Sequence, residues 1–322
     1  MPFADIIGHE RPVRILRAGL AAQRLPHALL FEGPDGVGKK LVALEMAKAL
    51  NCEARGDDAC GDCRSCSKIA RDVHPDVKLV RRAADKSSLL VEQVRELIRG
   101  LQYRPYEGRA KVVIIDGAED LSAGGENALL KTLEEPTDDS FLVLITSEPN
   151  RLLPTTRSRC QRIAFGTLPR DEVAAAARKK ADGDETAAAV LAALAGGSLG
   201  HLRRLDAGTV IERWEAALAA SAGRLGSLSE VLELAEAESG SRERAGRFLA
   251  LVEVALRDLM LRAAGGPEAM LVCPAPGDED PAPLSPGQLV DRLELVDRAR
   301  RELLRNANPR LVLESSLLRL RG

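Results

Sequence analysis

A glycine-rich segment near the amino terminus has the residue types and spacing of a loop that binds phosphate. It follows a short apolar run and reads Gly33-Pro34-Asp35-Gly36-Val37-Gly38-Lys39-Lys40. Glycines let backbone N–H groups turn toward an anion, the next helix adds its dipole, and the first lysine reaches the β- and γ-phosphates. The sequence therefore predicts phosphate binding by Gly33, Gly36, Gly38 and Lys39.

The residue after this lysine departs from the usual pattern. A Ser or Thr hydroxyl normally helps to hold Mg²⁺ there, but this chain has Lys40. An ammonium cannot ligate a metal, and its charge repels one. The loop is therefore either a weakened ATPase site or a shape kept for packing. ATP hydrolysis is not expected, and the sequence leaves nucleotide binding undecided.

A second acidic position belongs to the same chemistry. The apolar run 111–115 ends in Asp116, where a nucleotide-hydrolysing domain places a carboxylate in the Mg²⁺ shell. The following residue is usually the glutamate that polarises the attacking water, but here it is Gly117. Glu119 lies three residues beyond Asp116 and is not expected to have the same geometry.

Four cysteines form a closely spaced group of metal-ligand type. Cys52, Cys60, Cys63 and Cys66 follow the pattern C-x7-C-x2-C-x2-C, with Gly and Asp turns between them. Such spacing can place four thiolates at the corners of a tetrahedron, which suits a structural Zn²⁺ because no position is left for water. Redox-active cysteines and unbound thiols are the alternatives. His74 is more consistent with a capping or turn role than with a fifth ligand.

Composition limits the class of protein. The chain has 322 residues, 45% of them hydrophobic but only 2% aromatic, which favours helical cores of Leu, Ala, Val and Ile. Lys plus Arg total 46 against 48 Asp plus Glu, so any contact with DNA must be local. No run of about 18 apolar residues occurs and the amino terminus lacks a signal pattern, so we expect a cytoplasmic protein with no membrane partner.

These residues need a scaffold, and alternating strands and helices predict one. The expected strands are 28–31, 77–80, 111–116, 141–146 and 161–165, and the expected helices are 7–25, 41–50, 91–101 and 127–135. This alternation over residues 1–166 predicts an α/β domain with a parallel sheet and ligand loops at the strand ends.

The rest of the chain has helical periodicity. A helical pattern over 168–206 is interrupted at Gly196-Gly197, and amphipathic helices follow from 209, with a mobile loop expected over 265–287. We therefore expect three domains: a nucleotide-binding-like domain at 1–166 with a zinc module at 52–66, a helical lid at 167–207, and a helical oligomerisation (collar) domain at 208–322. A free-standing helical bundle is the alternative for the last of these.

Together, these motifs resemble one family, the sliding-clamp loader subunits of bacterial DNA polymerase III, which are members of the AAA+ group. The resemblance covers essentially the whole chain and rests on the phosphate loop, the four cysteines, and four further segments: Ile7-Gly8-His9-Glu10, Leu25-Pro26-His27-Ala28, Ser158-Arg159-Cys160 and Asn306-Ala307-Asn308-Pro309. It implies an AAA+ sheet domain followed by a small helical lid and a helical collar.

Within that family some subunits are ATP-driven motors and others are not. Lys40 and Gly117 favour the non-motor class, as does Gly200, because the resemblance places a sensor arginine near that position. His201, Arg203 and Arg204 follow, so a shifted sensor stays an alternative. The implied role is a stator that assembles with motor subunits and a clamp-opening subunit to load the sliding clamp onto primer-template DNA. The rivals are an active motor subunit and, from another class, a zinc-dependent DNA-binding protein.

The resemblance also assigns a catalytic residue. It implies that Arg159 projects into the ATP site of a neighbouring motor subunit, where an arginine can stabilise charge on the γ-phosphate. Arg157 competes for this role, and a surface salt bridge is the simpler explanation of Arg159.

Contact with DNA has the weakest sequence support. Residues Lys86-Ser87-Ser88 before a helix, with Arg95 and Arg99 on it, could meet DNA phosphates. A solvated helix face accounts for them equally well.

Overall fold

The computed structural model describes residues 2–82, 89, 91–267, 270–272 and 284–321. These form two compact units, one of Met1–Pro169 with Ser198–Gly200 and the other of Arg170–Gly197 with His201–Gly322. The predicted lid and collar both fall in the second unit, and their separation stays a prediction.

The first unit is built on a five-stranded parallel sheet, as predicted. Its strands are β1 Ala28–Glu32, β2 Val77–Arg81, β3 Lys111–Asp116, β4 Ser140–Thr146 and β5 Gln161–Ala164, in the order β2-β3-β4-β1-β5. The register places Phe31 of β1 opposite Ile145 of β4, and Leu144 of β4 opposite Ile115 of β3. The central strands are nearly all apolar because helices cover both faces of the sheet.

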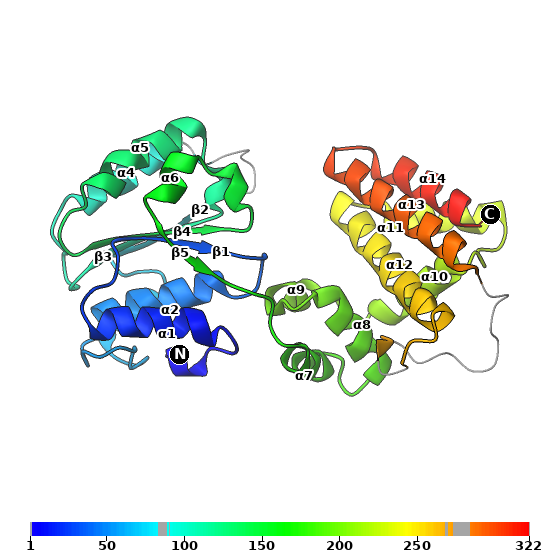
Figure 1. Ribbon diagram of the computed structural model, residues 1–322, viewed down its shortest axis with the longest axis horizontal. Helices are drawn as coiled ribbons and strands as arrows, with labels where there is room; N and C mark the ends of the chain where they lie inside the picture. The colour runs from blue at the N-terminus through cyan, green and yellow to red at the C-terminus, as the bar shows by residue number, and fades with distance from the viewer. Residues whose placement is uncertain (1, 83–88, 90, 268–269, 273–283, 322) are drawn as a thin grey trace. The chain divides into compact units, whose positions relative to one another are not determined.

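Two helical layers enclose this sheet (Figure 1). On one face α1 (Glu10–Ala21) and α2 (Lys39–Asn51) bury Leu16 and Met46 against Phe31 and Ile114. On the other face α4 (Val91–Leu101) and α5 (Ala123–Glu134) pack against the strand residues of opposite parity. Alternate side chains of each strand thus supply two separate cores.

Short elements connect this framework. They are the helices α3 (Arg64–Ala70) and α6 (Pro154–Ser158) and the 3₁₀ turns η1 (Phe3–Asp5), η2 (Ala118–Asp120) and η3 (Pro149–Arg151). The helix expected at 7–25 is shorter because Gly8 and His9 have φ of 68° and 63°, which prevents an earlier start. Helix α5 begins before the expected residue 127 because Ser122 caps it by accepting from Gly125 N at 3.2 Å.

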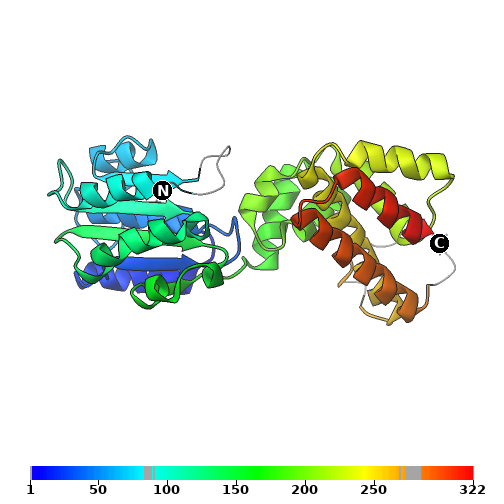
Figure 2. The same cartoon turned by 90° about the horizontal axis from the view of Figure 1, so that it is seen from above.

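The second unit is helical, as predicted. Its helices are α7 Arg170–Lys180, α8 Glu185–Ala195, α9 Leu199–Arg204 (whose first two residues group with the first unit), α10 Val210–Ser221, α11 Leu228–Glu238, α12 Arg242–Ala263, α13 Pro286–Leu304 and α14 Pro309–Arg321. Within it α12 packs against α10 and α13, and α14 packs against α11 (Figure 2). Ser285 and Gln288 form a capping box at the start of α13.

The structure bears only partly on the expected mobile loop and on the expected lack of a membrane partner. Much of the loop expected at 265–287 lies outside the described residues. Of the helices that the structure describes, none combines the length and apolar character needed to span a bilayer.

Candidate functional site

The phosphate loop lies at the carboxyl end of β1, where parallel sheets place their ligand sites. Gly33 has φ of 149°, and a Cβ at this position would lie 2.2 Å from the carbonyl oxygen of Phe165. Gly38 has φ of 119° and caps the start of α2. Both positions therefore require glycine, and the backbone conformation of the loop explains why glycines recur at this spacing.

The first lysine of the loop is buried within it. Lys39 is 5% exposed, and its Nζ donates to the carbonyl oxygens of Gly33 and Pro34, both at 2.6 Å. Burial lowers the pKa of Lys39, while the negative charges of nearby carboxylates oppose this shift. The structure thus brings together all four predicted phosphate-binding residues.

The second lysine forms an ion pair where a metal would be expected. Nζ of Lys40 lies 3.7 Å from Oδ2 of Asp116 at the end of β3. The loop position that normally supplies a hydroxyl to Mg²⁺ is therefore occupied by the cation of Lys40. Asp116, which would otherwise belong to the Mg²⁺ shell, is the counter-ion of this lysine. These residues do not fit Mg²⁺.

Glu119, another acid near the loop, is engaged elsewhere. Oε1 of Glu119 accepts from Ser147 N at 3.2 Å and from Ser147 Oγ at 2.7 Å. Burial acts to raise the pKa of Glu119, but hydrogen bonds including those from Ser147 outweigh it and lower this pKa overall. Oε2 of Glu119 is buried and has no hydrogen-bond partner within the described part of the chain. Gly117, with φ of 87°, occupies the position after Asp116.

Gly200 lies against the phosphate loop within the first unit. Its N–H donates to the carbonyl oxygen of Gly36 at 2.9 Å. A Cβ at position 200 would lie 2.6 Å from Gly36 Cα, so a side chain cannot enter without moving the loop backbone. This contact explains the glycine found where the resemblance places a sensor arginine.

The four predicted cysteines come together in space. The Sγ atoms of Cys52, Cys60, Cys63 and Cys66 all lie within 4.8 Å of one another. Four thiolates around a tetrahedral ion with metal–sulfur bonds of about 2.3 Å have sulfurs about 3.8 Å apart, so the group fits a metal after a small contraction. Cys160 is buried in the sheet core and is not part of this group.

Backbone N–H groups already point at the sulfurs. Cys60 N donates to Cys52 Sγ at 3.3 Å, and Cys63 N and Cys66 N donate to the Sγ atoms of Cys60 and Cys63, both at 3.4 Å. Cys63 is also the N-cap of α3, a helix that the sequence did not indicate. Such donors stabilise thiolates, so the module could bind a metal ion.

Sequence reasoning missed a buried polar anchor beside the module. His74 is 2% exposed, its Nε2 lies 3.1 Å from Ser65 Oγ on α3, and its Nδ1 accepts from Asp76 N at 3.2 Å. Oδ1 of Asp76 accepts from Tyr106 N at 2.7 Å, and Oδ2 accepts from the N–H groups of residues 107 and 108 at 2.9 and 2.8 Å. Of the predicted capping or turn role of His74, the hydrogen bond from Asp76 N supports the turn. The available signal for the anchor was the run His74-Pro75-Asp76.

Arg159 lies just after α6, on a firmly held segment. Glu126 Oε2 accepts from Leu153 N at 2.9 Å and fixes the start of α6. Arg159 donates through Nε to Glu134 Oε1 at 2.8 Å and through Nη1 to Thr155 O at 3.0 Å, and its side chain is 35% exposed. In the isolated chain, Arg159 is therefore a surface residue in an intramolecular ion pair. Its competitor Arg157 donates to Asn150 Oδ1 at 3.0 Å.

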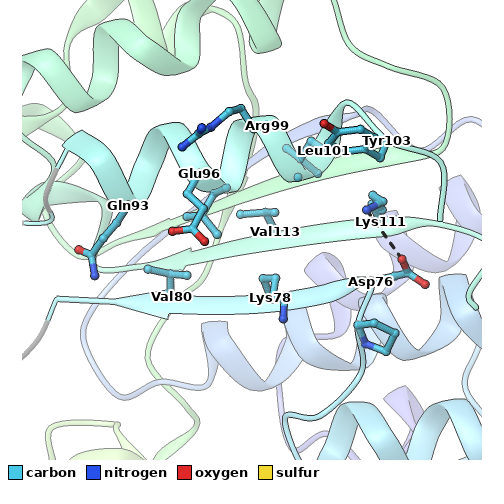
Figure 3. A pocket seen from close by; sticks show the side chains of 13 residues that line it. Asp76, Lys78, Val80, Gln93, Glu96, Arg99, Leu101, Tyr103, Lys111 and Val113 are labelled. Carbon is cyan, nitrogen blue, oxygen red and sulfur yellow. Dashed lines mark ion pairs between the residues drawn. The ribbon is translucent and has the colours of Figure 1, made fainter. Parts of the chain in front are cut away.

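The predicted DNA contacts are only partly placed. Arg95 and Arg99 are exposed on α4, with Arg95 3.7 Å from Glu92, whereas Lys86-Ser87-Ser88 lies outside the described residues. A cavity of about 700 Å³ lies between α4 and strands β2 and β3 (Figure 3). Its lining mixes both signs of charge, including Lys78, Glu96, Arg99 and Lys111, and contains none of the phosphate-loop residues or cysteines.

The strand order, the phosphate loop after β1 and the acidic end of β3 define the class: this is an AAA+-type domain followed by a helical region. The chain belongs to the family described as DNA polymerase III, delta subunit, whose model matches residues 8–169. The resemblance to clamp-loader subunits is therefore confirmed.

Individual relatives agree with this family. DNA polymerase III subunit delta' of Bacillus subtilis is 40% identical over 158 residues, which are 49% of this chain and 47% of that protein. DNA polymerase III subunit tau of Escherichia coli is 40% identical over 173 residues, 53% of this chain and 26% of that protein. The chain thus spans about a quarter to a half of the length of these curated relatives.

A solved structure supports the fold over a greater length. The crystal structure of a DNA polymerase III gamma subunit-related protein from Thermotoga maritima aligns with a TM-score of 0.50 and 17% identity. The alignment covers 96% of this chain and 98% of that one.

Proposed function

We propose that this chain is a non-motor, delta'-like stator of the replicative sliding-clamp loader. In this role it donates Arg159 in trans to a neighbouring ATPase subunit while the clamp is loaded onto primed DNA. The observation that carries the proposal is the Lys40–Asp116 ion pair, because it puts a cation and its counter-ion where hydrolysis requires Mg²⁺. A chain with this pair lacks the metal centre of a motor but can still act on a partner's ATP.

The surroundings of Arg159 support a role in trans. Its pairing with Glu134 is a partly exposed ion pair, of a kind that contributes only about 0–1 kcal/mol. An arginine finger contributes about 10³–10⁵ in rate, which corresponds to roughly 4–7 kcal/mol. Exchanging the carboxylate for a partner's phosphate therefore costs little compared with the gain, and both groups accept the same two-pronged contact.

We assign a structural Zn²⁺ to the cysteine module. Four thiolate ligands with no fifth donor and no open position are typical of closed structural zinc sites. When bound, the ion supplies positive charge that keeps all four thiols deprotonated. It takes no part in phosphate chemistry in this proposal.

Assembly through the carboxyl-terminal helices is the remaining part of the proposal. Leu304 at the end of α13 is 82% exposed, and Leu311 and Leu318 on α14 are 63% and 38% exposed. Leu311 and Leu318 are seven residues apart and so lie on one face of the helix. We assign this face to contacts with motor subunits and the clamp-opening subunit. The complex would act in the cytoplasm, where it meets the sliding clamp and primer-template DNA.

An active motor subunit is the second candidate, favoured by the intact glycines and Lys39 and by the similarity to tau. ATP turnover by the purified chain in Mg²⁺ separates the two. We expect no turnover above that of a Lys39→Ala variant, because the metal position is filled by Lys40. Steady turnover that is lost in Lys39→Ala would establish the motor and overturn the stator proposal.

A further inference from the structure

The side chain of Arg159 is folded back onto its own chain, a position that we call retracted. Its Nε and Nη2 atoms lie 2.8 and 2.5 Å from Oε1 of Glu134, the last residue of α5. Its Nη1 donates to the carbonyl oxygen of Thr155 in α6 at 3.0 Å. Helices α5 and α6 pack against each other, as Figure 1 shows, so both partners belong to the surface from which Arg159 would have to project.

Glu134 is an acid in a place that favours a cationic partner. The carboxyl-terminal end of a helix carries partial negative charge, which disfavours a carboxylate and attracts a guanidinium. The next residue, Glu135, is a second exposed acid. Within the described residues, Arg159 is the cation that pairs with Glu134. Charge therefore contributes to holding Arg159 in the retracted position.

Arg159 can leave this position without movement of the backbone. Thr156, three residues before it, and Cys160, directly after it, are buried, and Arg159 N donates to Thr156 O at 3.2 Å. Glu126, which is also buried, fixes the start of α6. The Arg159 side chain itself is 35% exposed. Rotation of this side chain on a fixed backbone is therefore enough to release it.

The retracted position and a role in trans exclude each other. A side chain that lies on α5 and α6 cannot at the same time project toward a neighbouring subunit. Carboxylate and phosphate are both anions that a guanidinium binds through paired N–H groups, so they compete for it. We propose that Glu134 is a positioning residue for Arg159, whose carboxylate holds the guanidinium retracted until a neighbouring phosphate replaces it. This inference rests on the proposed role of Arg159 in trans.

Glu134→Gln in the reconstituted clamp loader tests the inference, because it removes the charge and keeps the shape of the side chain. The value of kcat/KM compares the transition state with the free complex, in which the proposal has Arg159 retracted. Loss of a partly exposed ion pair from that free state should raise kcat/KM for ATP at the neighbouring site by about two- to fivefold. Glu135→Gln removes the adjacent acid, which makes no ion pair within the described residues, and should change kcat/KM by less than about 1.5-fold.

Two further measurements separate positioning from a structural role. Glu134→Gln should have no effect on kcat/KM in an Arg159→Ala background, because it acts through the arginine. In the isolated chain, phenylglyoxal should modify Arg159 about two- to fivefold faster in Glu134→Gln than in Glu135→Gln, as peptide mass spectrometry would show. Size-exclusion chromatography would check the assembly of each variant.

Four results would each overturn the inference. They are an unchanged or lower kcat/KM in Glu134→Gln, an equal rise in Glu135→Gln, a rise that persists in the Arg159→Ala background, and equal phenylglyoxal rates in the two glutamine variants. If Arg159→Ala lost activity in the same assay, the proposed role in trans would stand while the inference about Glu134 failed. Unchanged activity in Arg159→Ala would instead overturn the role in trans, and the inference with it.

Discussion

Adjacent lysines in the phosphate loop have different roles that their side-chain positions explain. Lys39 turns into the loop and is buried by it, while Lys40 turns to Asp116 and stays partly exposed. Lys39 occupies the position of a phosphate-binding lysine, whereas Lys40 occupies the position at which a hydroxyl normally helps to hold a metal. The loss of that hydroxyl could be predicted from the residue type at position 40 alone. The pairing with Asp116 could not, because it joins residues 76 positions apart through the order of the strands.

The Asp76 anchor gives a prediction at the residue scale. Asp76→Ala would leave three N–H groups without their acceptor, and we expect a loss of about 3 kcal/mol in the free energy of unfolding. Urea unfolding would measure it. Asp138→Ala, at an exposed site, is the control and should lie within about 0.5 kcal/mol of the unaltered chain. A similar loss in both variants would contradict the role of the anchor.

The same residue sets a pH dependence. Burial acts to raise the pKa of Asp76, but the three backbone hydrogen bonds and Lys111 outweigh it, so the folded-state pKa is lowered. Its contribution is therefore fully present above the unfolded pKa of about 3.9 and is lost as the pH falls through the folded value. Stability below about pH 4 should fall more steeply in the unaltered chain than in Asp76→Ala, as urea midpoints across pH would show.

At the scale of elements, the five strands were predicted almost to their ends, whereas α1 begins three residues later and α5 four residues earlier than expected. Strand β3 and helix α4 match the expected ranges, because long apolar runs and strong helical periodicity fix such elements locally. Helix α3 was missed because its seven residues carry no clear periodicity, and Cys63 and the neighbouring thiols define its start. The capping of α5 by Ser122 was hidden by the Gly124-Gly125 pair.

The cysteine module gives a prediction at this scale. Purified chain should contain about one zinc ion, and Cys66→Ser should lose most of it, because structural sites need all four ligands. Amide exchange in α3 should become faster in that variant, since the helix begins within the ligand group. Metal analysis and hydrogen-exchange mass spectrometry would measure both.

Cys160→Ser is the matched control, because Cys160 is buried but lies outside the group. It should keep its zinc. Unaltered chain without metal, or equal zinc loss in both variants, would refute the zinc assignment.

At the scale of the whole molecule, the chain combines a phosphate loop unsuited to Mg²⁺ with an arginine on its surface. Sequence motifs located Arg159, but its partner Glu134 lies at the end of α5, 25 residues earlier, and became apparent only in the folded chain. The helical unit was predicted in outline, whereas its pairing of α12 with α10 and α13 depends on tertiary packing that periodicity does not specify. Because the proposed function has Arg159 act on a neighbouring subunit, it depends on assembly.

The most direct test of this account is the DNA-stimulated ATPase of the reconstituted clamp loader carrying Arg159→Ala in this chain. The account predicts a fall of at least about 10³ at the neighbouring site, with assembly intact by size-exclusion chromatography. Arg157→Ala, two residues away at an arginine that donates to Asn150, should retain most of the activity. Unchanged ATPase in Arg159→Ala, or an equal loss in Arg157→Ala, would contradict the assignment of Arg159 as the residue donated in trans.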